Sequence, residues 1–159
     1  MKLNKPVSLL LFLTLLAMAL AGCTATKKMF GMTNNIDISI KTTKDVNLDA
    51  QGNPSPIVVR LYELTTAVEF RKADYDALFN NDQATLGKEM LRRDEYEIKP
   101  EQTRIIARKA KENTKYLGLL AAYHDTTNIK WRALISLNSS GNADMKLLLE
   151  KTGFTVPQD

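Results

Sequence analysis

Apolar and polar residues alternate in several short stretches of the chain, which is the pattern of half-buried β-strands. Three isoleucines alternate with polar residues over 35–43 and predict a first strand there. The β-branched run 57–64 predicts a second strand. The continuously apolar run 117–123 predicts a strand in the middle of a sheet, covered on both faces. Further short strands are predicted at about residues 95–98, 103–108, 131–137, 145–150 and 154–156.

A helical period interrupts the strands between about residues 66 and 91. Thr66 with Glu69 three residues later matches a capping box, in which each side chain accepts a backbone N–H at a helix start. The polar residues 80–82 should end this helix, and residues 85–91 have the spacing of a second, short one. The apolar face that should pack on one end of the sandwich consists of Phe70, Ala77 and Leu78.

Seven or eight short strands with turns between them, plus one helical insertion, predict an all-β fold, an antiparallel β-sandwich, over residues 36–159. Residues 100–102 should turn the chain so that the strand at 103–108 forms a hairpin with the strand before it. No internal repeat interrupts this order. The sequence therefore predicts one domain.

Residues 1–22 have the features of a signal peptide rather than of a folded element. Lys2 and Lys5 give a positive start, residues 7–21 are almost wholly apolar, and small residues precede Cys23. The apolar run of about 15 residues is shorter than the roughly 20 that a membrane-spanning helix needs. We therefore expect this segment to be removed.

Cys23 is the only cysteine of the chain, and the run Leu-Ala-Gly-Cys that it closes resembles the lipobox of bacterial lipoproteins. The resemblance implies cleavage after Gly22 and acylation of Cys23, with residues 23–35 as a lipidated N-terminus and tether. Three acyl chains would anchor the protein stably. Thr24 stands where Asp would retain a lipoprotein at the inner membrane, so the resemblance favours the inner leaflet of the outer membrane. The alternative is an ordinary signal peptide with a cysteine nearby.

Composition narrows the function classes. Removal of residues 1–22 takes away two lysines and leaves 137 residues with 20 basic and 18 acidic side chains, enough for one domain with its own core. Because the single cysteine is assigned to lipid, no disulfide can staple the fold. No basic stripe with interleaved aromatic residues is present, which argues against nucleic acid as a partner.

Catalytic and metal-binding groups are scarce. His124 is the only histidine, and its neighbour Asp125 should point to the other face of a strand. No nucleophile motif accompanies them, so a catalytic role is not expected and His124 is interpreted as a solvated turn residue. One histidine and a lipidated cysteine cannot supply the three or four ligands of a zinc site. We expect no enzyme, no metal and no cofactor besides the covalent lipid on Cys23.

A long loop follows the first strand, and two prolines stiffen it. A stiff loop presents a fixed shape with little ordering cost, which favours protein binding. A plain connection between strands is an equally good interpretation of the residues alone. The candidate partner-binding residues are Asn47, Leu48, Asp49, Ala50, Gln51, Gly52, Asn53 and Pro54.

The order of these features resembles the TssJ family, also called SciN or VasD, whose members are outer-membrane lipoproteins of the type VI secretion system. The run Ser-Pro-Ile-Val-Val-Arg-Leu-Tyr-Glu-Leu at 55–64 is the most distinctive match. His124 departs from the pattern, because arginine is expected there more often. The other matching landmarks are the lipobox, the loop 47–56, Phe70, residues 73–79, 86–87, 117–123 and 131–132.

The resemblance implies a transthyretin-like β-sandwich with a helical insertion and no enzymatic activity. It implies binding to the periplasmic domain of TssM, within a membrane complex of TssJ, TssL and TssM, with no small-molecule substrate. The family's first inter-strand loop, here residues 47–56, is implicated in that contact. Two other classes remain open: a periplasmic ligand-binding lipoprotein of β-sandwich type, which needs a concave apolar pocket, and a lipoprotein hydrolase.

Overall fold

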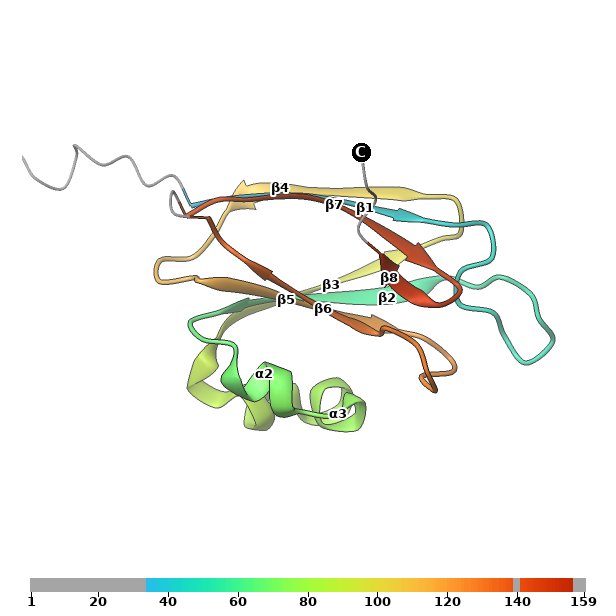
Figure 1. The fold of residues 1–159 in the computed structure, drawn as a ribbon, viewed down its shortest axis with the longest axis horizontal. Helices are drawn as coiled ribbons and strands as arrows, with labels where there is room; N and C mark the ends of the chain where they lie inside the picture. Colours follow the sequence, from blue (N-terminus) through green and yellow to red (C-terminus); the bar gives the residue numbers. More distant parts are fainter. Residues whose placement is uncertain (1–33, 139–140, 156–159) are drawn as a thin grey trace, which may run out of the picture. The chain divides into compact units, whose positions relative to one another are not determined.

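Two four-stranded sheets stack face to face in a computed structural model of the protein, which describes residues 34–138 and 141–155 (Figure 1). The first sheet has the order β4 (Thr103–Lys109), β1 (Asn35–Thr42), β7 (Ala143–Glu150) and β8 (Gly153–Thr155). The second has the order β3 (Met90–Ile98), β2 (Ile57–Leu64), β5 (Tyr116–Ala122) and β6 (Arg132–Ser136). The predicted signal peptide, Cys23 and nearly all of the tether lie outside the described residues.

The main core fills the space between the sheets, and alternation explains which side chains enter it. Ile36, Ile38 and Ile40 of β1 are fully buried there, as the first predicted strand requires. Strand β5 lies between β2 and β6 and its central residues are buried on both faces, which confirms the prediction from its unbroken apolar run. The β-sandwich is therefore confirmed.

Two strand pairings differ from the prediction. Strands β1 and β7 run parallel, so the first sheet is mixed rather than wholly antiparallel. Strands β3 and β4 do not form the predicted hairpin, because they belong to different sheets. The turn between them is bound to the end of β1: the Thr42 hydroxyl donates to the Lys99 carbonyl at 2.6 Å and accepts from the Gln102 N–H at 3.0 Å. These contacts hold the turn in which the chain passes from the second sheet to the first.

Helices α2 (Val68–Lys72) and α3 (Tyr75–Leu86) and the short 3-10 helix η1 (Gly87–Glu89) cover the outer face of the second sheet (Figure 1). The prediction that they pack on one end of the sandwich is wrong. Phe70 and Leu78 are buried against this face, whereas Ala77 is only half-buried. The Phe70 ring lies directly on Gly118 of β5, where an added Cβ would come within 2.7 Å of it. The small residue therefore lets the helical layer approach the sheet.

The predicted capping box does not form. Helix α2 begins after Ala67, and no side chain at that position caps it. The buried carboxylate of Glu89 instead accepts hydrogen bonds from the Thr66 hydroxyl and from the N–H groups of Glu69 and Phe70, at 2.7 to 3.1 Å. A carboxylate from a distant residue thus satisfies N–H groups that helix geometry leaves unpaired.

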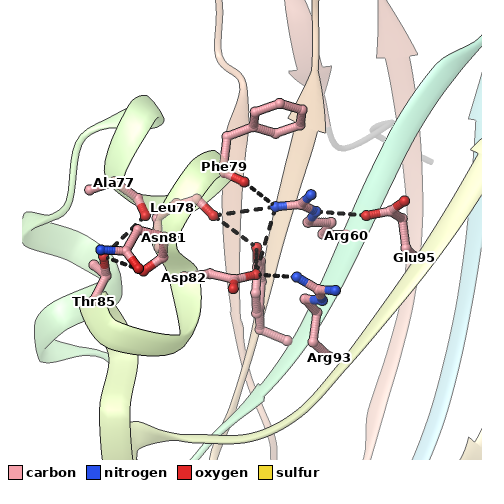
Figure 2. A network of polar contacts seen from close by, with 10 residues as sticks. Arg60, Ala77, Leu78, Phe79, Asn81, Asp82, Thr85, Arg93 and Glu95 are labelled. Atoms are coloured by element: carbon pink, nitrogen blue, oxygen red, sulfur yellow. Dashed lines mark hydrogen bonds and ion pairs between the residues drawn. The ribbon is translucent and has the colours of Figure 1, made fainter.

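Helix α3 continues through the residues that were expected to end it, with a kink at Asn81, whose φ and ψ are not helical. Two side chains donate hydrogen bonds to carbonyl groups that precede the kink (Figure 2). Thr85 donates to Ala77 O, and Arg60 donates to Phe79 O at 2.6 Å. Asp82 is buried under the kink. It accepts from Arg93 at 2.9 Å and from the Tyr62 hydroxyl at 3.1 Å.

A buried carboxylate also joins the two sheets. Glu63 of β2 is fully buried and accepts hydrogen bonds from the Arg108 guanidinium of β4, from the Lys111 N–H and from the Thr114 hydroxyl. Arg108 donates in addition to Asp94 of β3 at 2.7 Å. Charge-assisted hydrogen bonds of this kind are strong, so Glu63 fixes both the sheet-to-sheet contact and the loop that follows β4.

Candidate functional site

The loop 47–56 projects from one end of the sandwich, on the right of Figure 1, together with the β5–β6 loop and the β7–β8 turn. We call this the loop end. The described chain begins at the opposite end, where Asn35 pairs with Lys109 and the Ala110 N–H donates to the Asn34 carbonyl at 2.7 Å. We call that the tether end. Strand β1, eight residues long, runs from the tether end to the loop end.

Asn47 holds the base of the loop. It has a positive φ of 49° and is buried, although it is polar. Its amide nitrogen donates to the Ser55 hydroxyl at 3.0 Å and to the Pro56 carbonyl at 2.8 Å, and its amide oxygen accepts the His124 N–H at 2.8 Å. Asn47 thus ties the beginning of the loop to its end and to the neighbouring β5–β6 loop. Asn47 therefore positions the loop.

The outer half of the loop is a small turn built around Asp49. One carboxylate oxygen accepts the N–H groups of Gln51 and Asn53 at 2.9 and 2.8 Å, and Leu48 forms a β-bridge with Pro54. Gly52 has a φ of 81°, a conformation that glycine adopts without strain. The hydrogen bond from the Asn53 N–H, with smaller contributions from the Asn53 side chain and the Gln51 N–H, lowers the pKa of Asp49. The carboxylate is therefore ionised at neutral pH and the turn is pre-formed.

The predicted partner-binding residues are brought together, with different exposures. Asn47 is buried, and Leu48 and Asp49 are half-buried. The exposed tip of the loop consists of Ala50, Gln51, Gly52, Asn53 and Pro54. The structure describes their placement and leaves their binding role a prediction.

The loop also forms one wall of a hollow of about 460 Å³ that sequence reasoning missed. Its other walls come from the β5–β6 loop, with Tyr123, Asp125 and Ile129, and from Lys151. The pKa of Asp125 is lowered because the Thr127 N–H donates to its carboxylate. The pKa of Tyr123 is raised, mainly by burial. No local pattern could place residues 47–50 beside residues 123–129, because the contact depends on the strand order.

His124 is exposed, as expected, and it also contacts the loop. Its Nε2 lies 3.1 Å from the Ser55 hydroxyl, and its backbone N–H is the one that Asn47 accepts. In the described part of the chain, no group of three or more His, Cys, Asp or Glu side chains is placed to hold a metal ion.

Asn47 orders the loop through its side-chain hydrogen bonds and through its positive φ, and substitution should separate these two contributions to stability. Asn47→Gly removes the three side-chain hydrogen bonds but tolerates the positive φ, and we expect a loss of about 1–3 kcal/mol in the free energy of unfolding. Asn47→Ala removes the same bonds and adds the strain of a positive φ, about 1 kcal/mol more. Chemical denaturation of both variants measures the difference. Equal stability of the two variants would contradict the role of the backbone conformation.

Comparison with known proteins identifies a protein family that the chain matches. Residues 34–152 match the model of a protein family described as "Type VI secretion lipoprotein, VasD, EvfM, TssJ". No curated protein sequence matches the chain. Among the described residues, no helix has both the length and the apolar character required to cross a membrane.

Solved structures with the same fold include three related to type VI secretion. The lipoprotein TssJ1 from Pseudomonas aeruginosa is 30% identical, with a TM-score of 0.74 over 80% of this chain and 99% of that one. Lip from Serratia marcescens, a membrane-bound component of the type VI secretion system, is 22% identical, with a TM-score of 0.74 over 80% and 98%. A chain in the structure of the TssM C-terminal domain from EAEC is 19% identical, with a TM-score of 0.66 over 79% and 98%.

Proposed function

The chain belongs to the TssJ family of type VI secretion lipoproteins, and on this premise we propose that it links the outer membrane to TssM. In this proposal, acyl chains on Cys23 hold the protein in the inner leaflet of the outer membrane. The loop 47–56 binds the periplasmic domain of TssM within the membrane complex. The role is mechanical, without catalysis, cofactor or small-molecule substrate.

The opposite placement of the two ends supports this proposal. The described chain begins at Asn34, eleven residues after Cys23, at the tether end. The loop 47–56 lies at the loop end, and β1 alone spans about 26 Å between them at roughly 3.3 Å per residue. With lipid bound at one end and protein at the other, the sandwich would lie between the membrane and its partner.

The order within the loop supports a binding role as well. Asp49, Gly52 and Asn53 hold a turn whose tip is exposed, and Asn47 fixes its base. A pre-formed surface loses little conformational entropy when a partner binds, so more of the contact energy appears as affinity. Among the features of this chain, the pre-formed turn is the observation that supports the proposal most directly.

The hollow beside the loop favours a second candidate, a periplasmic ligand-binding lipoprotein. Its volume of about 460 Å³ falls within the range of small-molecule sites, and Tyr123 and Ile129 give it apolar walls. Because the loop forms one wall of the hollow, the two candidates share residues. They differ in the ligand that the protein with an intact loop should bind, which is TssM in the first candidate and a small molecule in the second.

Deletion of residues 49–53 should weaken TssM binding while preserving the fold. The deletion joins Leu48 to Pro54, which already form a bridge, and bridged residues lie only about 5 Å apart at their Cα atoms. We expect the unfolding temperature to change by less than about 4 °C and the affinity for the purified periplasmic domain of TssM to fall at least about tenfold. Titration calorimetry with the full lipoprotein in detergent measures the affinity.

A matched control changes a loop at the tether end. Asn113 has a positive φ of 68°, so Asn113→Gly should leave both stability and TssM affinity unchanged. If the deletion variant binds TssM with the affinity of the parent protein, the assignment of the loop is wrong. Weak binding to TssM by the parent protein, with tight binding of a small ligand, would favour the second candidate.

A further inference from the structure

A cluster of lysines occupies the tether end. The segment from Lys109, the last residue of β4, to Lys115, which precedes β5, contains Lys109, Lys111 and Lys115. We call it the lysine loop. All three side chains are exposed, and none of their ammonium groups forms an ion pair or hydrogen bond with another described residue. Glu112 is the one acidic residue of the loop, so its formal charge is +2.

The lysine loop is held rigidly. The fully buried Glu63 carboxylate accepts the Lys111 N–H and the Thr114 hydroxyl. The Lys115 N–H donates to the Leu64 carbonyl at 2.9 Å, and the Lys115 carbonyl accepts from Leu137 at 3.0 Å. The backbone of the loop is therefore fixed while its charged side chains are free to meet a partner, which lowers the ordering cost of binding.

The lysine loop differs in charge from the loops of the loop end. The exposed ionisable side chains of the loop end, over residues 43–56, 99–102, 123–131 and 151–152, are four lysines, His124 and three acidic residues, with Asp49 half-buried beside them. These charges balance when His124 is neutral. The lysine loop keeps an excess of two positive charges. An anionic surface would therefore be attracted to the lysine loop in preference to the loops of the loop end, although the exposed carboxylates of Asp37 and Asp144 lie near the tether end as well.

The position of the lysine loop suggests which anionic surface it meets. The Ala110 N–H is bonded to the carbonyl of Asn34, the first described residue. Asn34 is the eleventh residue after Cys23, and at roughly 3.3–3.6 Å per residue this stretch of chain reaches at most about 40 Å. If Cys23 carries lipid, the tether keeps the lysine loop within about 40 Å of the membrane surface and allows it to reach that surface. Electrostatic attraction there acts over a Debye length of about 8 Å.

We propose that the lysine loop is a membrane-contact surface that binds anionic phospholipid head groups of the leaflet holding the acyl chains. The contact turns the tether end toward the lipid, so the loop 47–56 faces away from the membrane and toward its partner. This inference rests on the proposed lipid anchor. Each net positive charge near an anionic surface strengthens the attraction about fivefold, so a charge of two favours contact about 25-fold.

Lysine modification on vesicles tests the orientation without any substitution. The full lipoprotein is added from detergent to preformed vesicles of phosphatidylethanolamine with about a quarter phosphatidylglycerol, or of phosphatidylcholine alone. An amine-reactive reagent then modifies exposed lysines, and mass spectrometry gives the rate at each one. We expect the rates at Lys109, Lys111 and Lys115 to be lower by up to about 25-fold on the anionic vesicles. Lys44 and Lys99 at the loop end serve as internal controls and should not change.

Two further measurements identify the cause of the protection. The double variant Lys111→Glu and Lys115→Glu changes the formal charge of the lysine loop from +2 to −2, so it should abolish the protection of Lys109. The control double variant, Lys44→Glu and Lys99→Glu, should leave that protection unchanged. Salt at about 1 M, which shortens the Debye length to about 3 Å, should also abolish it. Equal unfolding temperatures in detergent confirm that the variants are folded.

The outcomes separate the inference from the anchor on which it rests. Flotation of the protein with both kinds of vesicle, with equal modification rates on each, would overturn the membrane-contact surface and leave the anchor intact. Failure to float with either kind of vesicle would overturn the anchor, and the inference with it. Protection of the lysine loop that requires the TssM domain would assign the surface to the protein partner and overturn the membrane contact.

Discussion

Replacement of Cys23 by serine should release the protein from the outer membrane and abolish type VI secretion. Serine offers a hydroxyl in place of the thiol, which is the better nucleophile at neutral pH, so no thioether-linked lipid can form. A protein with three acyl chains is anchored stably, whereas one without them has no comparable attachment. We expect the membrane-bound fraction to fall at least about a hundredfold, as measured by separating soluble periplasm from outer membrane.

The control for this prediction is Thr24→Ser, which alters the neighbouring residue and keeps the acyl acceptor. It should fractionate with the outer membrane as the parent protein does. Cys23 lies outside the described sandwich, so the released variant should retain the unfolding temperature of the domain and its affinity for TssM. If Cys23→Ser still fractionates with the outer membrane, the lipid anchor is wrong.

The strands were the most predictable part of the fold, because one period sets which side chains are buried. The isoleucines of β1 all point into the core, and the apolar run of β5 is covered on both faces. The pairing of strands was less predictable. Strands β3 and β4 are separated by four residues, which suggested a hairpin, yet hydrogen bonds from the distant Thr42 direct the chain to the other sheet.

The helical insertion shows how tertiary contacts override local signals. Thr66 and Glu69 have the spacing of a capping box, but Glu89 supplies the carboxylate. Asn81 breaks the helical geometry without ending α3, because Asp82 finds buried partners in Tyr62 and Arg93. Partners that lie 11 to 23 residues away cannot be recognised by a local pattern.

The candidate site was partly predictable. Turn-forming residues and two prolines located the loop 47–56, and Asp49 and Gly52 act there as turn chemistry requires. Its contact with His124 and the hollow between the loops depend on β2 lying beside β5. The lysine loop shows no local motif either. Its place beside Asn34 becomes visible only when β4 pairs with β1.

Loss of the Glu63 carboxylate should be among the most destabilising changes available in the sandwich. Glu63→Ala leaves the Lys111 N–H and the Thr114 hydroxyl without their acceptor and removes one of the two carboxylates that pair with Arg108. Breaking a buried ion pair by removing one partner costs about 3–5 kcal/mol. At roughly 3–5 °C per kcal/mol for a domain of this size, the unfolding temperature should fall by about 10–20 °C. Differential scanning calorimetry measures it.

The isosteric variant Glu63→Gln should show how much of this effect is charge. Its amide oxygen can still accept one hydrogen bond, but its NH₂ group faces donors, so we expect a loss of about 2–3 kcal/mol. Glu97→Gln on the neighbouring strand β3 is the control: Glu97 is exposed, and the change should stay within about 0.5 kcal/mol. Because Glu63 also orders the lysine loop, hydrogen exchange at Lys111 and Lys115 should accelerate in Glu63→Gln more than exchange in the loop 47–56. Uniform acceleration, or a fall of less than about 3 °C in Glu63→Ala, would show that Glu63 does not hold the sheets and the loop together.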